Sequence, residues 1–144
     1  MTLTNAPQVP AWQAWLLAIR PKTLPAAVAP VLVGMALALT DGVFALLPAL
    51  AALAGALLIQ IGTNLANDYY DYLKGVDNTE RKGPARVAAS GLVTLPQLRF
   101  AIGLTVALAA LVGLYLVFVG GWPILVLGLA SIVSAVTYSG GPFP

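Results

Sequence analysis

The sequence predicts an all-α protein, a polytopic transmembrane helix bundle with about four spans. Hydrophobic residues make up 60% of the chain and charged residues only 8%, and the mean hydropathy is +0.91. A soluble domain needs a much more highly charged surface. The apolar residues also fall into four runs bounded by proline, glycine or charge, at roughly 23–40, 43–66, 96–119 and 122–138.

Residues 1–22 are predicted to form an N-terminal tail followed by an amphipathic segment in the membrane interface. Trp12, Trp15 and Leu16 recur at near-helical spacing and the run ends at Arg20, a pattern typical of such helices. This segment either is a simple anchoring helix or has a role in substrate binding. The first ten residues carry no positive charge, so we expect no removable secretion signal.

Residues 23–144 are predicted to form one transmembrane domain. The run 43–66 is long enough to cross a hydrocarbon core of ~30 Å at ~1.5 Å per residue, whereas the first and fourth runs are shorter. Glycines within the runs are expected to permit close helix packing. They are Gly34, Gly55, Gly103 and Gly113.

The distribution of basic residues predicts the orientation of the bundle. Arg20 and Lys22 precede the first run, and most of the other basic residues lie in or directly after the segment 67–95, whereas the remaining turns lack them. Because basic residues collect on the cytoplasmic side, we expect that segment and both termini to face the cytoplasm. The protein is then expected in the cytoplasmic membrane. In this setting the net charge of +2 does not indicate a nucleic-acid partner.

A polar stripe runs along the end of the second span. Its members recur at intervals of three or four and are Gln60, Asn64, Asn67, Asp71 and Lys74, with Asp68 beside them. One helix face therefore carries amides and carboxylates, and we expect it to look into the bundle. Gly75 is expected to end the helix, so that Asp77 and Glu80 lie on a loop over the cavity.

This stripe predicts a site for a cation and a phosphorylated ligand. Carboxylate oxygens one turn apart suit Mg²⁺, which readily takes phosphate oxygens as further ligands. Lysine and arginine in the loop supply complementary charge, and the apolar spans could hold a lipid tail. The alternative is that the amides only pack helices and that the loop charges only set topology. Cysteine and histidine are absent, which excludes a thiolate site and the commonest zinc ligands.

The run Asn67-Asp68-Tyr69-Tyr70-Asp71 resembles the first aspartate-rich motif, N-D-x-x-D, of the UbiA-type membrane prenyltransferases. The resemblance extends to residues 20–25, 64–66, 74–77, 81–91 and 138–142 and covers most of 15–144. The spacing from Asp71 to Asp77 is similar to that of the 1,4-dihydroxy-2-naphthoate branch. This resemblance implies an enzyme that transfers a polyprenyl group from polyprenyl diphosphate to 1,4-dihydroxy-2-naphthoate, with loss of carboxylate, to give a demethylmenaquinone.

The resemblance also implies roles for individual residues. Asp68 and Asp71, with Asn64 and Asn67 beside them, would hold Mg²⁺ on the diphosphate, and Asp77 would complete that catalytic site. Lys82 and Arg86 would contact the diphosphate, and Lys22 would reach it from the first span. Alternatively, Lys22 does not contact the diphosphate and its charge only sets the membrane topology.

Members of this family are longer and carry a second aspartate-rich motif, which nothing in this sequence matches. We therefore expect an N-terminal half that retains diphosphate-binding elements but shows little turnover alone. Another aromatic prenyltransferase of the same family is an alternative function. Two alternatives from other classes are half of a transporter and a membrane scaffold whose basic loop binds anionic lipid.

Overall fold

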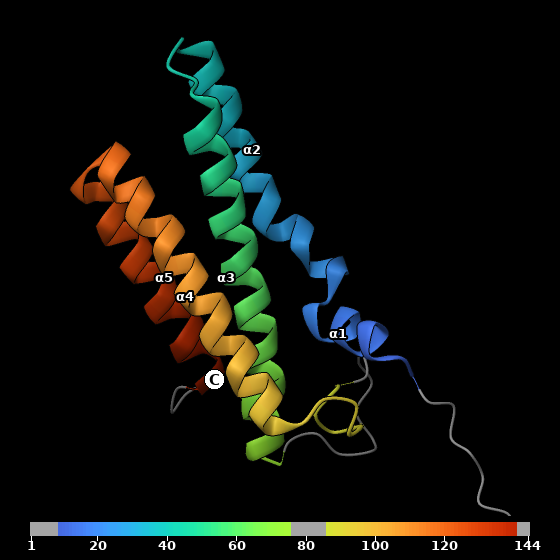
Figure 1. Ribbon diagram of the computed structural model, residues 1–144. Helices are drawn as coiled ribbons and strands as arrows, with labels where there is room; N and C mark the ends of the chain where they lie inside the picture. The colour runs from blue at the N-terminus through green and yellow to red at the C-terminus, as the bar shows by residue number, and fades with distance from the viewer. Residues whose placement is uncertain (1–8, 76–85, 141–144) are drawn as a thin grey trace, which may run out of the picture.

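The computed structural model describes residues 9–75 and 86–140, and in these ranges all regular structure is helical. The elements are α1 (Ala11–Ile19), the 3₁₀ helix η1 (Pro21–Thr23), α2 (Leu24–Thr40), α3 (Leu46–Leu73), α4 (Leu95–Gly120) and α5 (Trp122–Gly140). Figure 1 shows α3 at the centre, with α1 and α2 on one side and α4 and α5 on the other. The predicted all-α bundle is confirmed.

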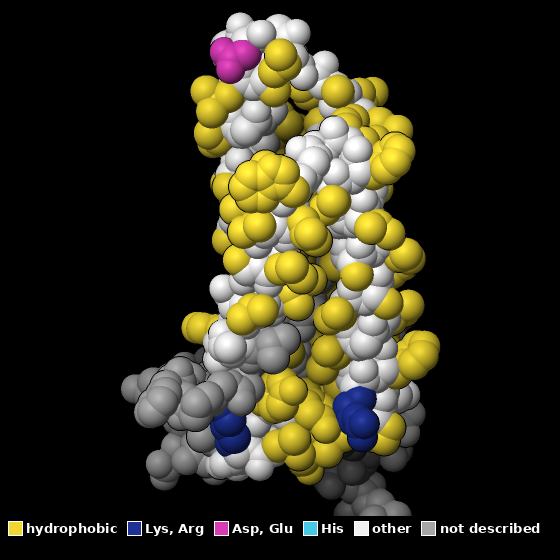
Figure 2. Space-filling model, turned by 90° about the vertical axis from the view of Figure 1, so that its left-hand side faces the viewer, with side chains coloured by type: hydrophobic (Ala, Val, Ile, Leu, Met, Phe, Trp, Pro, Cys, Tyr) yellow, Lys and Arg dark blue, Asp and Glu magenta, His cyan; other side chains and the backbone are white. Residues whose placement is uncertain are grey.

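The helices are apolar enough to make this a membrane protein. Among the described residues, three stretches are long and apolar enough to cross a bilayer, Ala11–Thr40, Leu46–Leu73 and Leu95–Gly120, and a shorter apolar stretch covers Trp122–Ser134. Many large apolar side chains are exposed along these helices. In the face shown in Figure 2, an apolar band separates basic side chains at one end from an acidic one at the other. Such a surface suits lipid contact around the band.

Helix α3 extends beyond the predicted span 43–66. It continues to Leu73 and places the whole aspartate-rich motif on helical backbone. Gly75 follows with a φ of +64°, and its N–H donates to the Tyr72 carbonyl oxygen at 3.2 Å. Because this left-handed conformation favours glycine, the predicted helix end at Gly75 is confirmed.

The start of α4 is fixed by a capping box. The Thr94 hydroxyl accepts from the Gln97 backbone N–H at 3.4 Å, and the Gln97 side chain accepts from the Thr94 N–H at 2.9 Å. Pro96 lies in the first turn, where a missing N–H costs nothing. This cap begins α4 at the same end of the bundle as the end of α3 (Figure 1).

The buried core lies at this end of the bundle. There α1, the end of α3, the segment 86–93 and the start of α4 meet around a cluster of buried apolar residues, Ala14, Ala18, Leu65, Val87, Ala88, Val93 and Leu98. Helix α1 lies across the end of the bundle (Figure 1), and its two buried alanines face this cluster. The core therefore holds together the segments that surround the aspartate-rich motif.

Close packing of α3 on α4 depends on Gly55 and Gly62. A Cβ atom at Gly55 would lie 3.4 Å from Val112 Cγ1, and one at Gly62 would lie 3.2 Å from Thr105 Oγ1. The expectation of close packing at Gly55 is therefore confirmed. Among the described residues, Gly34, Gly103 and Gly113 have nothing within 4 Å of such an atom, so the expectation is wrong for these three within that part of the chain.

We expect Gly62→Leu to lower the free energy of unfolding by about 1–3 kcal/mol, because the added side chain forces α4 away from α3. The matched control is Gly103→Leu, which adds the same atoms in open space and gains helix propensity. Titration of the micelle-bound protein with a denaturing detergent measures both variants. Equal effects of the two substitutions would contradict the packing role of Gly62.

Candidate functional site

A buried carboxylate, that of Asp68, is the centre of the polar cluster at the end of α3. Its side chain is 1% exposed. Its Oδ1 pairs with the Arg20 guanidinium and accepts from Arg86 Nη1 at 3.4 Å, and its Oδ2 accepts from the Val87 backbone N–H at 3.2 Å. Both oxygens of this carboxylate therefore have partners within the chain.

Arg20 reaches Asp68 because the chain turns sharply between α1 and η1. Arg20 is the non-glycine residue with positive φ in the described ranges, at 56°, and Pro21 follows it. The Thr23 hydroxyl donates to the Arg20 carbonyl oxygen at 2.9 Å. This turn directs the guanidinium toward α3, and Arg20 Nε is buried with no hydrogen-bond partner among residues 9–75 and 86–140.

Asn64, one turn before Asp68, holds the same junction. Its Nδ2 donates to the Ile19 carbonyl oxygen and to the Thr23 hydroxyl, both at 2.8 Å, and its Oδ1 accepts from Gln60 at 3.4 Å. The Ile19 carbonyl lies at the end of α1, where helix carbonyls lack internal partners. Asn64 therefore ties the junction of α1 and η1 to α3.

Asp71 lies nearer the surface than Asp68. Its side chain is 24% exposed, and Oδ2 pairs with Arg86 Nη2. Since Arg86 Nη1 contacts Asp68, one guanidinium spans both aspartates. Asn67 is half-buried on the same face of α3 as Asp71.

The predicted site residues are thus partly brought together. Asp68, Asp71 and Arg86 form one ion-paired cluster, and Asn64 and Asn67 lie on α3 beside it, with Asn64 bonded to Ile19 and Thr23. Lys22 is exposed on η1 at the same end of the bundle, and its contact with a ligand stays a prediction. Asp77 and Lys82 lie outside the described residues.

Sequence reasoning missed Arg20 as a member of the cluster and assigned it only to topology. Its partner Asp68 is far away in the sequence, so no local pattern joins them. The available signal was physical: a buried carboxylate on a transmembrane helix requires a cation close by.

The oxygen ligands of the cluster suit a hard cation, but they form only part of a site. Within 9–75 and 86–140, no group of three acidic, histidine or cysteine residues could hold a metal ion. Asn67 and Asp71 offer amide and carboxylate oxygens at half-exposed positions, the ligand type that Mg²⁺ prefers. Further ligands would have to come from elsewhere.

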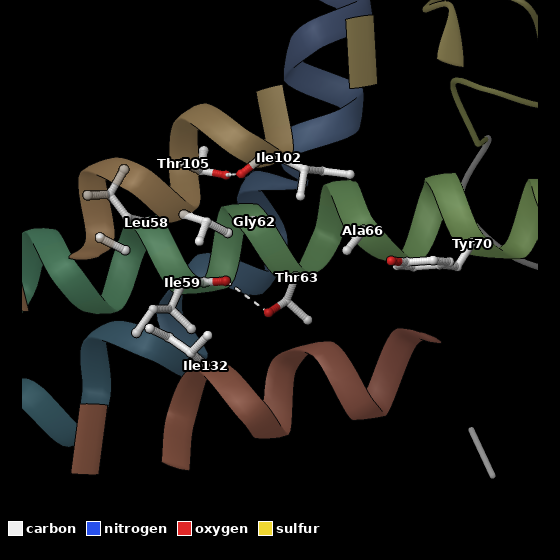
Figure 3. A pocket seen from close by; sticks show the side chains of 11 residues that line it. Leu58, Ile59, Gly62, Thr63, Ala66, Tyr70, Ile102, Thr105 and Ile132 are labelled. Atoms are coloured by element: carbon white, nitrogen blue, oxygen red, sulfur yellow. Dashed lines mark hydrogen bonds between the residues drawn. The ribbon is translucent and has the colours of Figure 1, made fainter. Parts of the chain in front are cut away.

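An apolar groove lies between α3, α4 and α5 and extends along α3 from Leu58 to Tyr70. Tyr70, adjacent to Asp71, lies at one end of it (Figure 3). Thr63 and Thr105 also line it, but their hydroxyls donate to backbone carbonyls of their own helices. The groove is lined by α3, α4 and Ile132 of α5, and it therefore offers an apolar surface.

Comparison with known proteins gives one family. The sequence profile of the UbiA prenyltransferase family matches residues 27–144. The 1,4-dihydroxy-2-naphthoate octaprenyltransferase of Escherichia coli (strain K12) is 46% identical over 95% of this chain and 46% of its own length. The protein of that name from Mycobacterium tuberculosis (strain ATCC 25618 / H37Rv) is 38% identical over 90% of this chain and 44% of its own.

A further relative of the same name, from Bacillus subtilis (strain 168), is 37% identical over 87% of this chain and 40% of its own length. The chain thus spans less than half the length of each of these relatives. No solved structure gives a significant match.

Proposed function

Because the chain belongs to the UbiA prenyltransferase family, we propose that it supplies the diphosphate-binding half of a 1,4-dihydroxy-2-naphthoate polyprenyltransferase. The observation that carries this proposal is the similarity to relatives of that name along nearly the whole of this chain. The substrates are then a polyprenyl diphosphate and 1,4-dihydroxy-2-naphthoate. The product is demethylmenaquinone in its reduced form.

The proposed site binds the diphosphate through charge. Asp71 and Asn67, with Asp77, would hold Mg²⁺, which supplies electrostatic stabilisation of the diphosphate leaving group when bound. Arg86, Lys82 and Lys22 provide positive charge for the phosphate oxygens. The pairing of Arg86 with Asp71 supports this arrangement, because it keeps a guanidinium beside the proposed ligand.

The proposed reaction needs no protein nucleophile. The allylic carbon–oxygen bond breaks with its electron pair passing to the diphosphate, and a ring carbon of the naphthoate forms a bond to the allylic carbon. The ring carboxylate then leaves as CO₂, and the electrons of its bond restore the aromatic ring. The chain's own residues bind and orient the diphosphate.

The proposed location is the cytoplasmic membrane, with the aspartate-rich end of α3 at the cytoplasmic face. Arg20, Lys22 and Arg86 lie at this end, and Arg99 is in the second turn of α4. Asp41, between α2 and α3, lies at the opposite end. Because basic residues favour the cytoplasmic side, both termini and the segment 67–95 are placed there.

Metal removal tests the proposed activity. We expect membranes that contain this chain together with the other half of the polyprenyltransferase to form demethylmenaquinone from octaprenyl diphosphate and 1,4-dihydroxy-2-naphthoate, EDTA to abolish the product, and excess Mg²⁺ to restore it. Liquid chromatography with mass spectrometry measures the product, and membranes without the protein are the control. Product formation that EDTA does not reduce would contradict the metal site. Prenylation of 4-hydroxybenzoate in preference to the naphthoate would contradict the proposed acceptor.

A further inference from the structure

The two aspartates of the N-D-x-x-D sequence, Asp68 and Asp71, differ in their surroundings. Asp68 is 1% exposed, and both of its oxygens accept from groups of the chain. Asp71 is 24% exposed, and its Oδ2 pairs with Arg86. Asp68 therefore faces the protein interior, and Asp71 faces outward.

A metal ligand must direct a lone pair at the ion, and to do so Asp68 would have to give up a buried partner. Breaking a buried ion pair leaves an uncompensated charge, which is costly. Arg20 has more to lose than Arg86, because Arg86 also pairs with Asp71, whereas Arg20 Nε has no hydrogen-bond partner among the described residues. The chain's own cations thus occupy the place that a metal would take at Asp68.

We infer that Asp68 is a positioning residue that fixes Arg20 and Arg86, and that the metal ligands of this motif are on the Asp71 side. The assignment of a metal to Asp71 rests on the proposed function, whereas the anchoring of the two arginines rests on contacts alone. Asp68 joins three segments in this way: the junction of α1 and η1, helix α3, and the segment that begins at Arg86.

This anchoring sets the position of Arg86 independently of Asp71. Arg86 holds Asp68 through Nη1 and Asp71 through Nη2, and the neighbouring Val87 N–H donates to the same Asp68. Two contacts therefore keep the segment on α3 when Asp71 is engaged elsewhere. Arg86 then remains beside Asp71 for an anionic ligand.

A charge-balanced pair of substitutions distinguishes a positioning role of Asp68 from a role as metal ligand. Electron paramagnetic resonance measures Mn²⁺ binding by the protein in nanodiscs. The proteins compared are wild type, Asp68→Asn, Asp71→Asn and the double variant Asp68→Asn/Arg20→Gln. The double variant removes one negative and one positive charge, so it leaves the net charge around Asp71 unchanged. We expect it to bind Mn²⁺ as wild type does, and Asp71→Asn to lose more than about tenfold in affinity.

A second measurement reports the anchoring without any metal. The chain has no native cysteine, so spin labels at Ala89→Cys and Leu73→Cys, both exposed positions, report the distance from the segment after Arg86 to α3. A pair at Ala26→Cys and Leu73→Cys does the same for the start of α2. We expect Asp68→Asn to broaden both distance distributions and Asp71→Asn to leave them narrow.

The outcomes are distinct. Loss of Mn²⁺ from the charge-balanced variant to the same extent as from Asp71→Asn would overturn the inference, because Asp68 would then be a ligand. Narrow distances in Asp68→Asn would overturn it as well. If wild type binds no Mn²⁺ while Asp68→Asn broadens the distances, the proposed metal site fails and the anchoring role stands.

Discussion

Asp71→Asn is expected to abolish the metal-dependent binding of polyprenyl diphosphate, with a loss of affinity of about 100-fold or more. The substitution keeps the shape of the side chain but removes the charge that a divalent cation needs. It also leaves Arg86 in place, because Arg86 retains its contact with Asp68. Binding of radiolabelled geranylgeranyl diphosphate to the protein in nanodiscs, with Mg²⁺ and with EDTA, measures the effect.

The matched control is Asp41→Asn, the same chemical change at the opposite end of the bundle, where the side chain is exposed. It should bind as wild type does. Unchanged or tighter diphosphate binding by Asp71→Asn would contradict the metal site. That result would favour a scaffold whose basic residues bind anionic lipid headgroups, since loss of a negative charge strengthens such binding.

Asp68→Ala is expected to lower the free energy of unfolding by about 3–5 kcal/mol. Removal of the carboxylate leaves two guanidinium groups, those of Arg20 and Arg86, close together without their shared counter-ion. It also leaves the buried Val87 N–H without its acceptor. Titration with a denaturing detergent, followed by circular dichroism, measures this loss.

Asp41→Ala is the control for the loss of an aspartate as such. Because Asp41 is exposed, its substitution is expected to change the stability by less than about 0.5 kcal/mol. Adding Arg20→Gln to Asp68→Ala should recover part of the lost stability, because it removes a positive charge that Asp68 compensates in wild type. Equal stability of Asp68→Ala and Asp41→Ala would show that the buried ion pairs contribute nothing.

The helices could be predicted from the sequence because long apolar runs bounded by proline and glycine leave few alternatives in a membrane. The end of α3 also followed from local rules, since Gly75 provides the left-handed residue that ends the helix. The sequence could predict that glycines allow close helix packing, but not which glycines lie between α3 and α4. Gly55 and Gly62 of α3 face α4, whereas Gly103 of α4 has no described atom within 4 Å of an added Cβ, and that depends on how the helices are rotated against each other.

The stripe on α3 predicted that Asn64, Asp68 and Asp71 lie along one region of the helix, but it did not separate their roles. Asp68 and Asp71 have the same chemistry and are one turn apart, and only their burial distinguishes them. That burial arises from α1 and the segment 86–93, which pack against Asp68 from distant parts of the sequence. The same long-range packing brings Arg20 into the cluster, so periodicity along α3 could not reveal it.

The most direct test of the proposed function follows the carboxyl carbon of the acceptor. Membranes that contain this chain together with the other half of the polyprenyltransferase are supplied with Mg²⁺, octaprenyl diphosphate and 1,4-dihydroxy-2-naphthoate labelled with ¹³C in its carboxyl group, and the labelled CO₂ and prenylated product are quantified by mass spectrometry. Prenyl transfer to the naphthoate with decarboxylation predicts one labelled CO₂ for each molecule of prenylated product, with neither formed by Asp71→Asn. A prenylated product that retains the label, or release of labelled CO₂ without octaprenyl diphosphate, would contradict it.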